Sequence, residues 1–201
     1  MYSLDDFLLD LQNRGENAPL NDINDSVGSP TPVPQLQGDI ANMDFSNFNY
    51  EDIDNANIYE KDGLYYSDNP YVNSIIGIES GHRANAHNAS GAAGVFQFMP
   101  STAKQYKLTN AYDPNESLRA YKQLTRDNIK QMKRMGIPIT PTTIYIAHQQ
   151  GVQGLARIMT ALRTGSELTG ATLRNVKNNS LGGYKGLQKY YDDWEARIKR
   201  G

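Results

Sequence analysis

The sequence places a helix-capping residue directly before a proline at three positions. The side chain of a capping residue satisfies free backbone N–H groups, and the fixed φ of proline suits the first helical position. Each pair therefore predicts the start of a helix. The three pairs are Asn69-Pro70, Asp113-Pro114 and Thr140-Pro141. We expect helices over 70–80, over 114–135 and from 141 onward, with the last one interrupted at Gly151.

A fourth helix is expected near 184–199, where apolar residues recur at helical spacing. These residues are Leu187, Tyr190, Tyr191, Trp194 and Ile198. Between the first two helices, residues 86–100 are rich in glycine and other small residues, which indicates an irregular or hairpin-like segment. The body of the chain is therefore predicted to be a mainly helical α+β domain.

The first 66 residues have a different composition. Residues 1–70 hold fourteen of the 22 acidic and two of the 20 basic residues, for a net charge of −12, and residues 71–201 carry +10. Alternating prolines in GSPTPVPQLQGD favour extended backbone. This half is too polar to form a core of its own. We expect a long extended arm over 1–66 and a folded domain over 67–201. The spaced apolar residues of the arm would serve as anchors on a partner or on the chain's own basic body. These residues are Phe45, Phe48, Tyr50, Ile53, Ile58 and Tyr59.

Composition also limits the possible function classes. The chain has no cysteine, which excludes a disulfide framework and a thiolate zinc site. No apolar run is long enough to span a bilayer, and the start MYSLDDFLLDLQNR carries acids where a secretory signal needs a basic flank. We therefore expect no membrane span and a route out of the cytoplasm other than such a signal. A basic body suits nucleic acid, a membrane surface or an anionic wall polymer.

Glu79 is the most informative single residue. It completes the apolar stripe of Val72, Ile75 and Ile76 on the first expected helix. Burial disfavours the charged form of a carboxyl group and raises its pKa, which suits a general acid near neutral pH. The alternative is a structural carboxylate that pairs with a basic residue such as Arg83.

The residues from Glu79 to Ala103 resemble a known family, the soluble lytic transglycosylase domain, which is a branch of the lysozyme superfamily close to goose-type lysozymes. The resemblance rests on Glu79-Ser80, on Ala86-His87-Asn88, and on the block GAAGVFQFMPSTA that starts at Gly91. Asp113-Pro114 and the looser Ala147-His148-Gln149-Gln150-Gly151 also fit the family pattern. The resemblance implies a lysozyme-like fold and covers about residues 68 to 160.

The resemblance also implies site residues. Glu79 takes the position of the catalytic acid. The substrate-binding positions are Asn88, Gln97, Met99, Tyr145, His148 and Gln149. Gln97 offers a donor and an acceptor for a sugar, although it could instead satisfy loop backbone. His148 and Gln149 replace the Tyr and Asn of the family motif, so Tyr145, one turn earlier, is a second candidate for the tyrosine's place beside the acid.

A single acid near the motif favours lysis over hydrolysis, because glycosidases of the usual kind need two carboxylates. Glu79 would protonate the oxygen between N-acetylmuramic acid and N-acetylglucosamine and then deprotonate the C6 hydroxyl, which closes a 1,6-anhydro ring without a cofactor or a metal. A goose-type hydrolase that takes a second acid from Glu116 or Glu167 is the alternative. A metal site at Glu79 and His82 lacks the repeated ligand pairs that it would need.

Other function classes remain open at this stage. The chain could be a structural or assembly protein that keeps a lysozyme-like fold, or a nucleic-acid-binding protein, although it has no recognisable reader motif. The expected substrate is peptidoglycan. A bacteriophage particle would explain delivery to the host periplasmic wall without a secretory signal, so we expect a virion-associated enzyme held by residues 1–66 to tail or portal proteins.

Overall fold

The computed structural model describes residues 47–200. Its elements are the 3-10 helix η1 (Tyr50–Asn55), the strands β1 (Ile58–Lys61) and β2 (Leu64–Ser67), and the helices α2 (Pro70–Ser80), α3 (Pro100–Gln105), α4 (Pro114–Arg134), α5 (Pro141–Thr164), α6 (Gly170–Asn178) and α7 (Leu187–Arg200). The predictions for the Pro-rich segment and the rest of residues 1–46 lie outside the described residues. The described fold is mainly helical with a two-stranded sheet, which confirms the predicted α+β class.

All three capped starts are confirmed. The side chains of Asn69, Asp113 and Thr140 accept hydrogen bonds from the first turns of α2, α4 and α5. Helix α2 ends at Gly81, which adopts a left-handed conformation with φ 58°. Helix α5 is broken where the sequence predicts it, at Gly151 with φ 67° and ψ 162°.

The sheet lies outside the segment expected to resemble a hairpin. Residues 86–100 form a loop held by two isolated bridges, His87 to Ala93 and Ala93 to Phe98. The antiparallel pair is β1 and β2, with Ile58 opposite Ser67 and Lys61 opposite Leu64. A tight turn joins these strands at Asp62-Gly63, both with positive φ, and an Asp-Gly pair is typical of such a turn.

The described part of the predicted arm packs against the body. Ile53 is 1% exposed and belongs to the hydrophobic core, and the Phe48 ring meets the Tyr71 ring edge-on at 5.5 Å. Arg126 of α4 pairs with Asp54 at 3.0 Å, and Lys133 lies 4.7 Å from the centre of the Tyr50 ring. The predicted boundary at residue 66 thus falls inside the folded body. Of the spaced apolar residues, Phe48, Tyr50, Ile53 and Ile58 pack in or against the core of the same chain, and basic residues of α4 face Asp54 and Tyr50.

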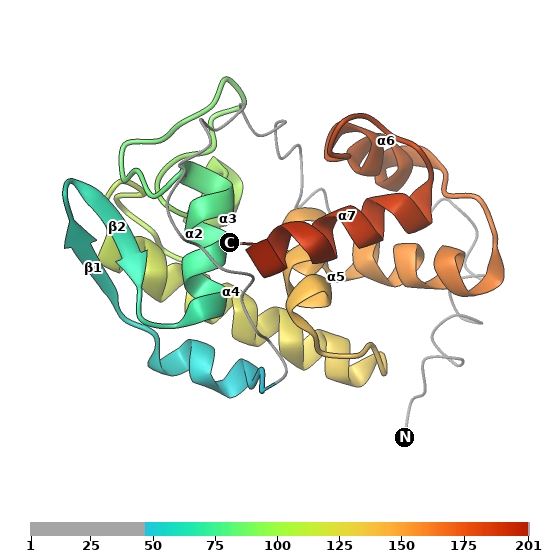
Figure 1. The fold of residues 1–201 in the computed structure, drawn as a ribbon, viewed down its shortest axis with the longest axis horizontal. Coiled ribbons are helices and arrows are strands. Elements are labelled where there is room, and N and C mark those ends of the chain that lie inside the picture. Colours follow the sequence, from blue (N-terminus) through green and yellow to red (C-terminus); the bar gives the residue numbers. More distant parts are fainter. Residues whose placement is uncertain (1–46, 201) are drawn as a thin grey trace.

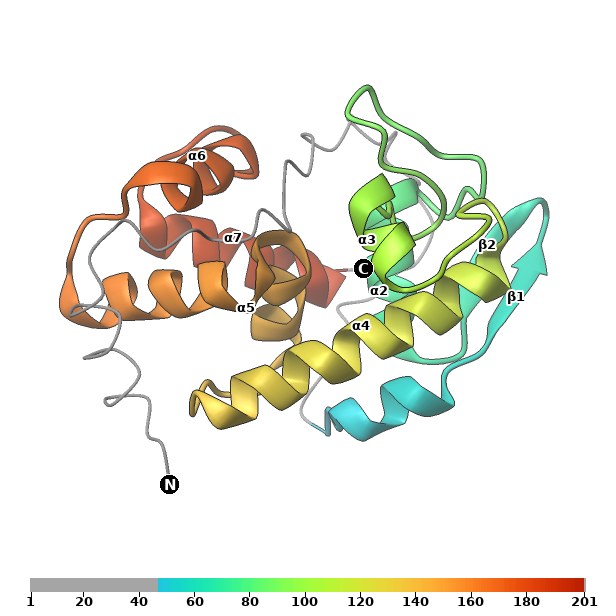
Figure 2. The same cartoon turned by 180° about the vertical axis from the view of Figure 1, so that it is seen from behind.

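Helix α5 is the centre of the fold (Figure 1). It packs on α4, α6 and α7, and α7 also packs on α2. Seen from behind, α4 runs as one long helix beneath α2 and α3, and the second half of α5 lies with α6 and α7 (Figure 2). Ser74 of α2 donates to the Ile198 carbonyl of α7 at 2.7 Å, so the last helix fixes the helix that carries Glu79. Among the described helices, none is long and apolar enough to cross a membrane.

Candidate active site

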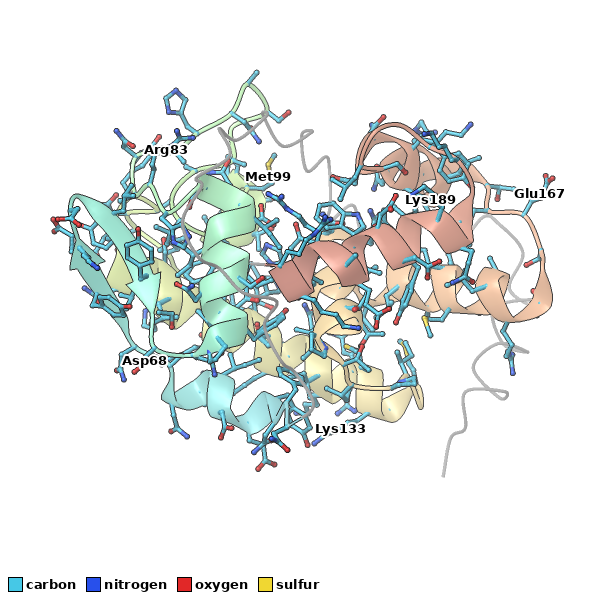
Figure 3. All side chains as sticks on the ribbon, in the orientation of Figure 1. Asp68, Arg83, Met99, Lys133, Glu167 and Lys189 are labelled. Carbon is cyan, nitrogen blue, oxygen red and sulfur yellow. The ribbon has the colours of Figure 1, made fainter. Side chains whose placement is uncertain are left out.

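Glu79 lies in the last turn of α2, and its side chain is 8% exposed. Burial raises the pKa of this carboxyl from 4.5 to about 7. The pKa is lowered only by the hydrogen bond from Tyr145. The alternative ion pair with Arg83 is not among the contacts of the described residues, and Arg83 is exposed on the loop after α2 (Figure 3). The carboxyl group is therefore close to half-protonated at neutral pH.

Tyr145 of α5 is the hydrogen-bond partner of Glu79. Its Oη donates to Glu79 Oε1 at 2.9 Å. Tyr145 is 1% exposed, and burial together with the Glu79 charge raises its pKa well above 10. The hydroxyl therefore keeps its proton and remains a donor. Because it occupies Oε1, it leaves Oε2 to carry the titrating proton.

A buried chain of side-chain hydrogen bonds continues behind Tyr145. Gln149 Nε2 donates to Tyr145 Oη at 3.0 Å, and Tyr190 Oη of α7 donates to Gln149 Oε1 at 3.1 Å. Gln150 Nε2 in turn donates to Tyr190 Oη at 3.3 Å. Each donor in this chain points toward Glu79. The chain joins three helices and fixes the direction in which the Tyr145 hydroxyl points.

His148 lies beside Glu79 without a hydrogen bond to it. Its Nε2 is 3.9 Å from Glu79 Oε1, and its side chain is 11% exposed. Burial lowers the pKa of His148 to about 4, so the ring is neutral where Glu79 titrates. The position that the sequence assigned to the family tyrosine therefore holds a neutral imidazole, and Tyr145 supplies the hydroxyl beside the acid.

Gln97 uses both of its amide hydrogens inside its own loop. Its Nε2 donates to the carbonyls of Gly94 at 2.8 Å and Ala86 at 3.1 Å. The Gln97 amide nitrogen thus binds the backbone of its loop, which is the alternative role considered from the sequence. The amide oxygen Oε1 can still accept a hydrogen bond from a ligand. A Cβ at Gly94 would lie 1.8 Å from the Ala111 carbonyl oxygen, so only glycine lets these two segments approach so closely.

Asn88 and Met99 occupy different parts of this region. Asn88 Oδ1 accepts from the backbone N–H groups of Ser90 at 2.9 Å and Ala92 at 3.1 Å, which fixes the loop. Met99 precedes α3 and lines a cavity. In Figure 3 it lies on the side of α2 and α3 that faces α6 and α7. Met99 thus lines the cavity, whereas the Asn88 side chain binds the backbone of its own loop.

A cavity of about 320 Å³ opens beside the acid, between α3, α4, α6 and the broken helix α5. Gln97, Met99, His148 and Gln150 are among its lining residues, whereas Glu79 is not. His148 connects the two: it lines the cavity, and its Nε2 lies 3.9 Å from Glu79 Oε1.

The other acids considered from the sequence have other partners or positions. Glu116 accepts from the backbone N–H groups of Thr109 at 2.7 Å and Asn110 at 3.0 Å. Glu167 is exposed on the loop between α5 and α6, at the end of the molecule away from α2 (Figure 3). Within residues 47–200, no charged group contributes to the pKa of Glu79, and no three or more His, Cys, Asp or Glu residues gather as a metal site.

Sequence reasoning missed Tyr190 and Gln150 as members of this site. Tyr190 was assigned to the apolar face of its helix, where it does lie, and its ring is 2% exposed. Only its hydroxyl reaches the buried chain. A tyrosine rather than a phenylalanine on a buried face was the available signal, because a buried hydroxyl needs a partner.

Parts of the chain are similar to known proteins. The family model "Transglycosylase SLT domain" matches residues 56–145, which is less than half of the chain. The match contains Glu79 and Gln97, and it ends at Tyr145, before His148. A protein named "Transglycosylase" from Enterobacteria phage PRD1 is 35% identical over 65 residues, which cover 32% of this chain. The chain spans 24% of the length of that relative. No solved structure matches the chain.

Proposed function

We propose that this chain, which matches the transglycosylase SLT domain model over residues 56–145, is a peptidoglycan lytic transglycosylase. It cleaves the β-1,4 bond between N-acetylmuramic acid and N-acetylglucosamine. The observation that carries the proposal is the buried Glu79 carboxyl, with a pKa of about 7 and a hydrogen bond from Tyr145 on one oxygen. A carboxyl group that is protonated near neutral pH can serve as a general acid.

Glu79 performs both proton transfers in the proposed reaction. Its Oε2 proton passes to the glycosidic oxygen as the bond from that oxygen to muramoyl C1 breaks. The muramoyl C6 hydroxyl then bonds to C1 and returns its proton to the carboxylate. The products are a free hydroxyl on one fragment and a 1,6-anhydro ring on the other, so no water enters. Tyr145 keeps its proton throughout and stabilises the carboxylate between the two steps.

The single-acid arrangement favours lysis over the goose-type hydrolytic alternative. Hydrolysis by inversion or retention uses a second carboxylate across the scissile bond. Among the described residues, Glu116 is committed to the backbone of its own loop and Glu167 is on a distant loop.

A bacteriophage particle is the proposed carrier of this enzyme, which would act on the host periplasmic wall. The support is the similarity to a phage protein named as a transglycosylase. Residues 1–46 hold eight acidic residues and one basic residue, a composition that suits docking on a basic face of a tail or portal protein.

Clearing of purified peptidoglycan by the full chain tests the enzymatic proposal. The wild-type chain should clear the wall, and the Glu79→Gln variant should be slower by about a hundredfold or more, because it keeps the side-chain shape but has no titrating proton. A folded Glu79→Gln variant that clears the wall at the wild-type rate would overturn the assignment of Glu79.

A further inference from the structure

Among residues 47–200, Arg157 is the one permanently charged side chain that lines the cavity beside Glu79. The remaining polar residues along its walls are neutral amides, hydroxyls and the neutral ring of His148. Five of these amides belong neither to the hydrogen-bond chain behind Tyr145 nor to the loop of Gln97. They are Gln105, Asn128, Gln131, Gln153 and Asn175. Such a wall suits a neutral sugar chain, because amides both donate to and accept from hydroxyl and acetamido groups. A lone cation in it needs a different explanation.

Arg157 is half-buried on α5, on the segment that follows the break at Gly151. Among residues 47–200 it forms no ion pair with a carboxylate. Its Nη1 donates to Thr172 Oγ1 at 3.5 Å, which is long for a hydrogen bond. A guanidinium group has five N–H donors in a planar fork that matches a carboxylate. Most of this donor capacity is available to a ligand in the cavity.

A second observation points to a ligand in the same cavity. Gln150 lines it and is 7% exposed, and its Oε1 is buried without a hydrogen-bond partner. His148, on the same wall, has its Nδ1 in the same condition. A buried polar atom without a partner is unfavourable. An acetamido N–H or a sugar hydroxyl in the cavity would supply the donor that Gln150 Oε1 lacks.

We propose that Arg157 binds a carboxylate of the substrate, so that the cavity selects carboxylated muramoyl glycan over a neutral glycan of the same length. This inference rests on the proposed function. The guanidinium would hold the carboxylate through two parallel N–H···O bonds while the neighbouring amides hold the sugar rings. Two sources supply this group in peptidoglycan: the lactyl carboxylate of a muramic acid without peptide, and a carboxylate within the peptide stem.

The Arg157 guanidinium acts on binding and not on the chemistry of Glu79. It is not among the groups that shift the pKa of Glu79. Replacing Arg157 should therefore weaken the use of carboxylated substrate without moving the pH dependence of the reaction. This separates a specificity role from general damage to the active site.

The test measures kcat/KM of the full chain on three glycans: peptide-bearing, peptide-stripped, and peptide-stripped with its lactyl carboxylates converted to neutral amides. The variants are Arg157→Gln and Arg157→Lys. The control is Arg174→Gln, which removes the same charge from an exposed position on α6 outside the cavity. We expect kcat/KM of the wild type and of the control to be about tenfold or more higher on a carboxylated glycan than on the amidated glycan. The reason is that the amidated glycan cannot form the charge-assisted hydrogen bond.

Arg157→Gln should lose this preference and Arg157→Lys should keep part of it. A preference confined to the peptide-bearing glycan assigns the carboxylate to the stem, and one that persists on the stripped glycan assigns it to the lactyl group. Equal rates on all three glycans in the wild type, or an unchanged preference in a folded Arg157→Gln variant, would overturn the inference.

Binding separates the failure of this inference from the failure of the proposed function. The Glu79→Gln chain should bind at least one of the two carboxylated muramoyl tetrasaccharides, peptide-free or peptide-bearing, at least several-fold more tightly than the peptide-free amidated form in calorimetric titration. If that preference disappears with Arg157→Gln added, Arg157 binds the carboxylate even in a chain that cleaves nothing. Equal affinities for the stripped, amidated and peptide-bearing fragments would refute carboxylate binding whatever the activity.

Discussion

The Tyr145 hydroxyl donates a 2.9 Å hydrogen bond to Oε1 of Glu79, across 66 residues of sequence. One oxygen of the carboxyl group is thereby occupied by a donor that burial prevents from ionising. The proton of Glu79 is left to Oε2. This hydrogen bond forms only when α2 and α5 pack together. The proton of Glu79 is therefore confined to one carboxyl oxygen only in the folded chain.

Replacing Tyr145 with Phe should raise the pKa of Glu79 further, because the hydrogen bond lowers it. A general acid must be protonated, so activity falls as pH rises through its pKa. The alkaline limb of kcat/KM should move up by about one pH unit, the equivalent of one hydrogen bond. The rate below the limb should fall, since the carboxyl loses its orientation. A pH–rate profile measures both, and an alkaline limb unchanged from wild type would contradict this role for Tyr145.

Replacing Tyr190 with Phe tests the hydrogen-bond chain at its far end. The change removes the donor to Gln149 Oε1 and the acceptor of Gln150 Nε2. We expect a loss of stability of about 1–3 kcal/mol from the unpaired amide groups, and a lower kcat with KM little changed, because Tyr190 does not line the cavity. Denaturant unfolding and steady-state kinetics measure the two effects. The isosteric removal of another hydroxyl, Tyr191→Phe, is the control, and equal kinetics in both variants would refute a positioning role.

The buried Glu79 should make stability depend on pH. Its pKa is raised from 4.5 when unfolded to about 7 when folded. Below pH 4.5 both states are protonated and the group contributes nothing. Between pH 4.5 and 7 the unfolded state ionises first, so the free energy of unfolding falls as pH rises. The loss levels off above pH 7 at about 3 kcal/mol, since one pKa unit corresponds to about 1.4 kcal/mol.

The matched comparison is the Glu79→Gln variant, which does not titrate at this position. The stability of the variant relative to wild type should increase from pH 4.5 to pH 8, as measured by denaturant unfolding at both pH values. A difference between the two proteins that stays constant over this range would show that Glu79 has an ordinary pKa.

Alanine substitutions at two glycines in the loop after α2 distinguish the cost of a steric clash from the cost of backbone strain. Gly94 and Gly91 both have positive φ, at 78° and 89°. A Cβ at Gly94 would lie 1.8 Å from the Ala111 carbonyl oxygen, whereas one at Gly91 would come no nearer than 3.6 Å to Pro100. Gly91→Ala should cost about 1 kcal/mol for strain alone. Gly94→Ala should cost several times more and abolish activity, and equal unfolding midpoints for the two variants would contradict the close approach.

The fold could be predicted well where its signals are local. The caps at Asn69, Asp113 and Thr140 and the break at Gly151 depend on neighbouring residues alone, and the structure confirms each. The hydrogen bond between Tyr190 and Gln149 joins residues 41 apart on two helices. No spacing rule predicts such a contact, because it depends on how the helices cross.

In the candidate site too, local features could be predicted from the sequence, whereas contacts between distant residues could not. Burial of Glu79 follows from its place on an apolar stripe, and the structure gives the raised pKa that this burial implies. The partner of the acid was left open between Tyr145 and His148, and only the packed helices decide it. Phe48, Tyr50 and Ile53 were predicted to be anchors for a partner or for the chain's own body, and the described residues place them on the body.

Two truncations distinguish the proposed docking segment, residues 1–46, from residues 47–66, which pack on the body. Removing residues 1–46 should leave folding and peptidoglycan cleavage intact and prevent incorporation into phage particles. Removing residues 1–66 should also destabilise the body, because it uncovers the core around Ile53. Thermal unfolding and particle composition measure these outcomes. Normal incorporation of the shorter truncation would show that residues 1–46 are not the docking segment.

Mass spectrometry of peptidoglycan digested by the full chain in heavy-oxygen water tests the central claim most directly, because it reports both activity and reaction type. If Glu79 is the single acid and base, the muramoyl ends should be 1,6-anhydro rings that contain no heavy oxygen. The Glu79→Gln chain should yield about a hundredth of these ends or fewer. Reducing muramoyl ends that carry the heavy oxygen would instead establish hydrolysis and contradict the single-acid lytic mechanism.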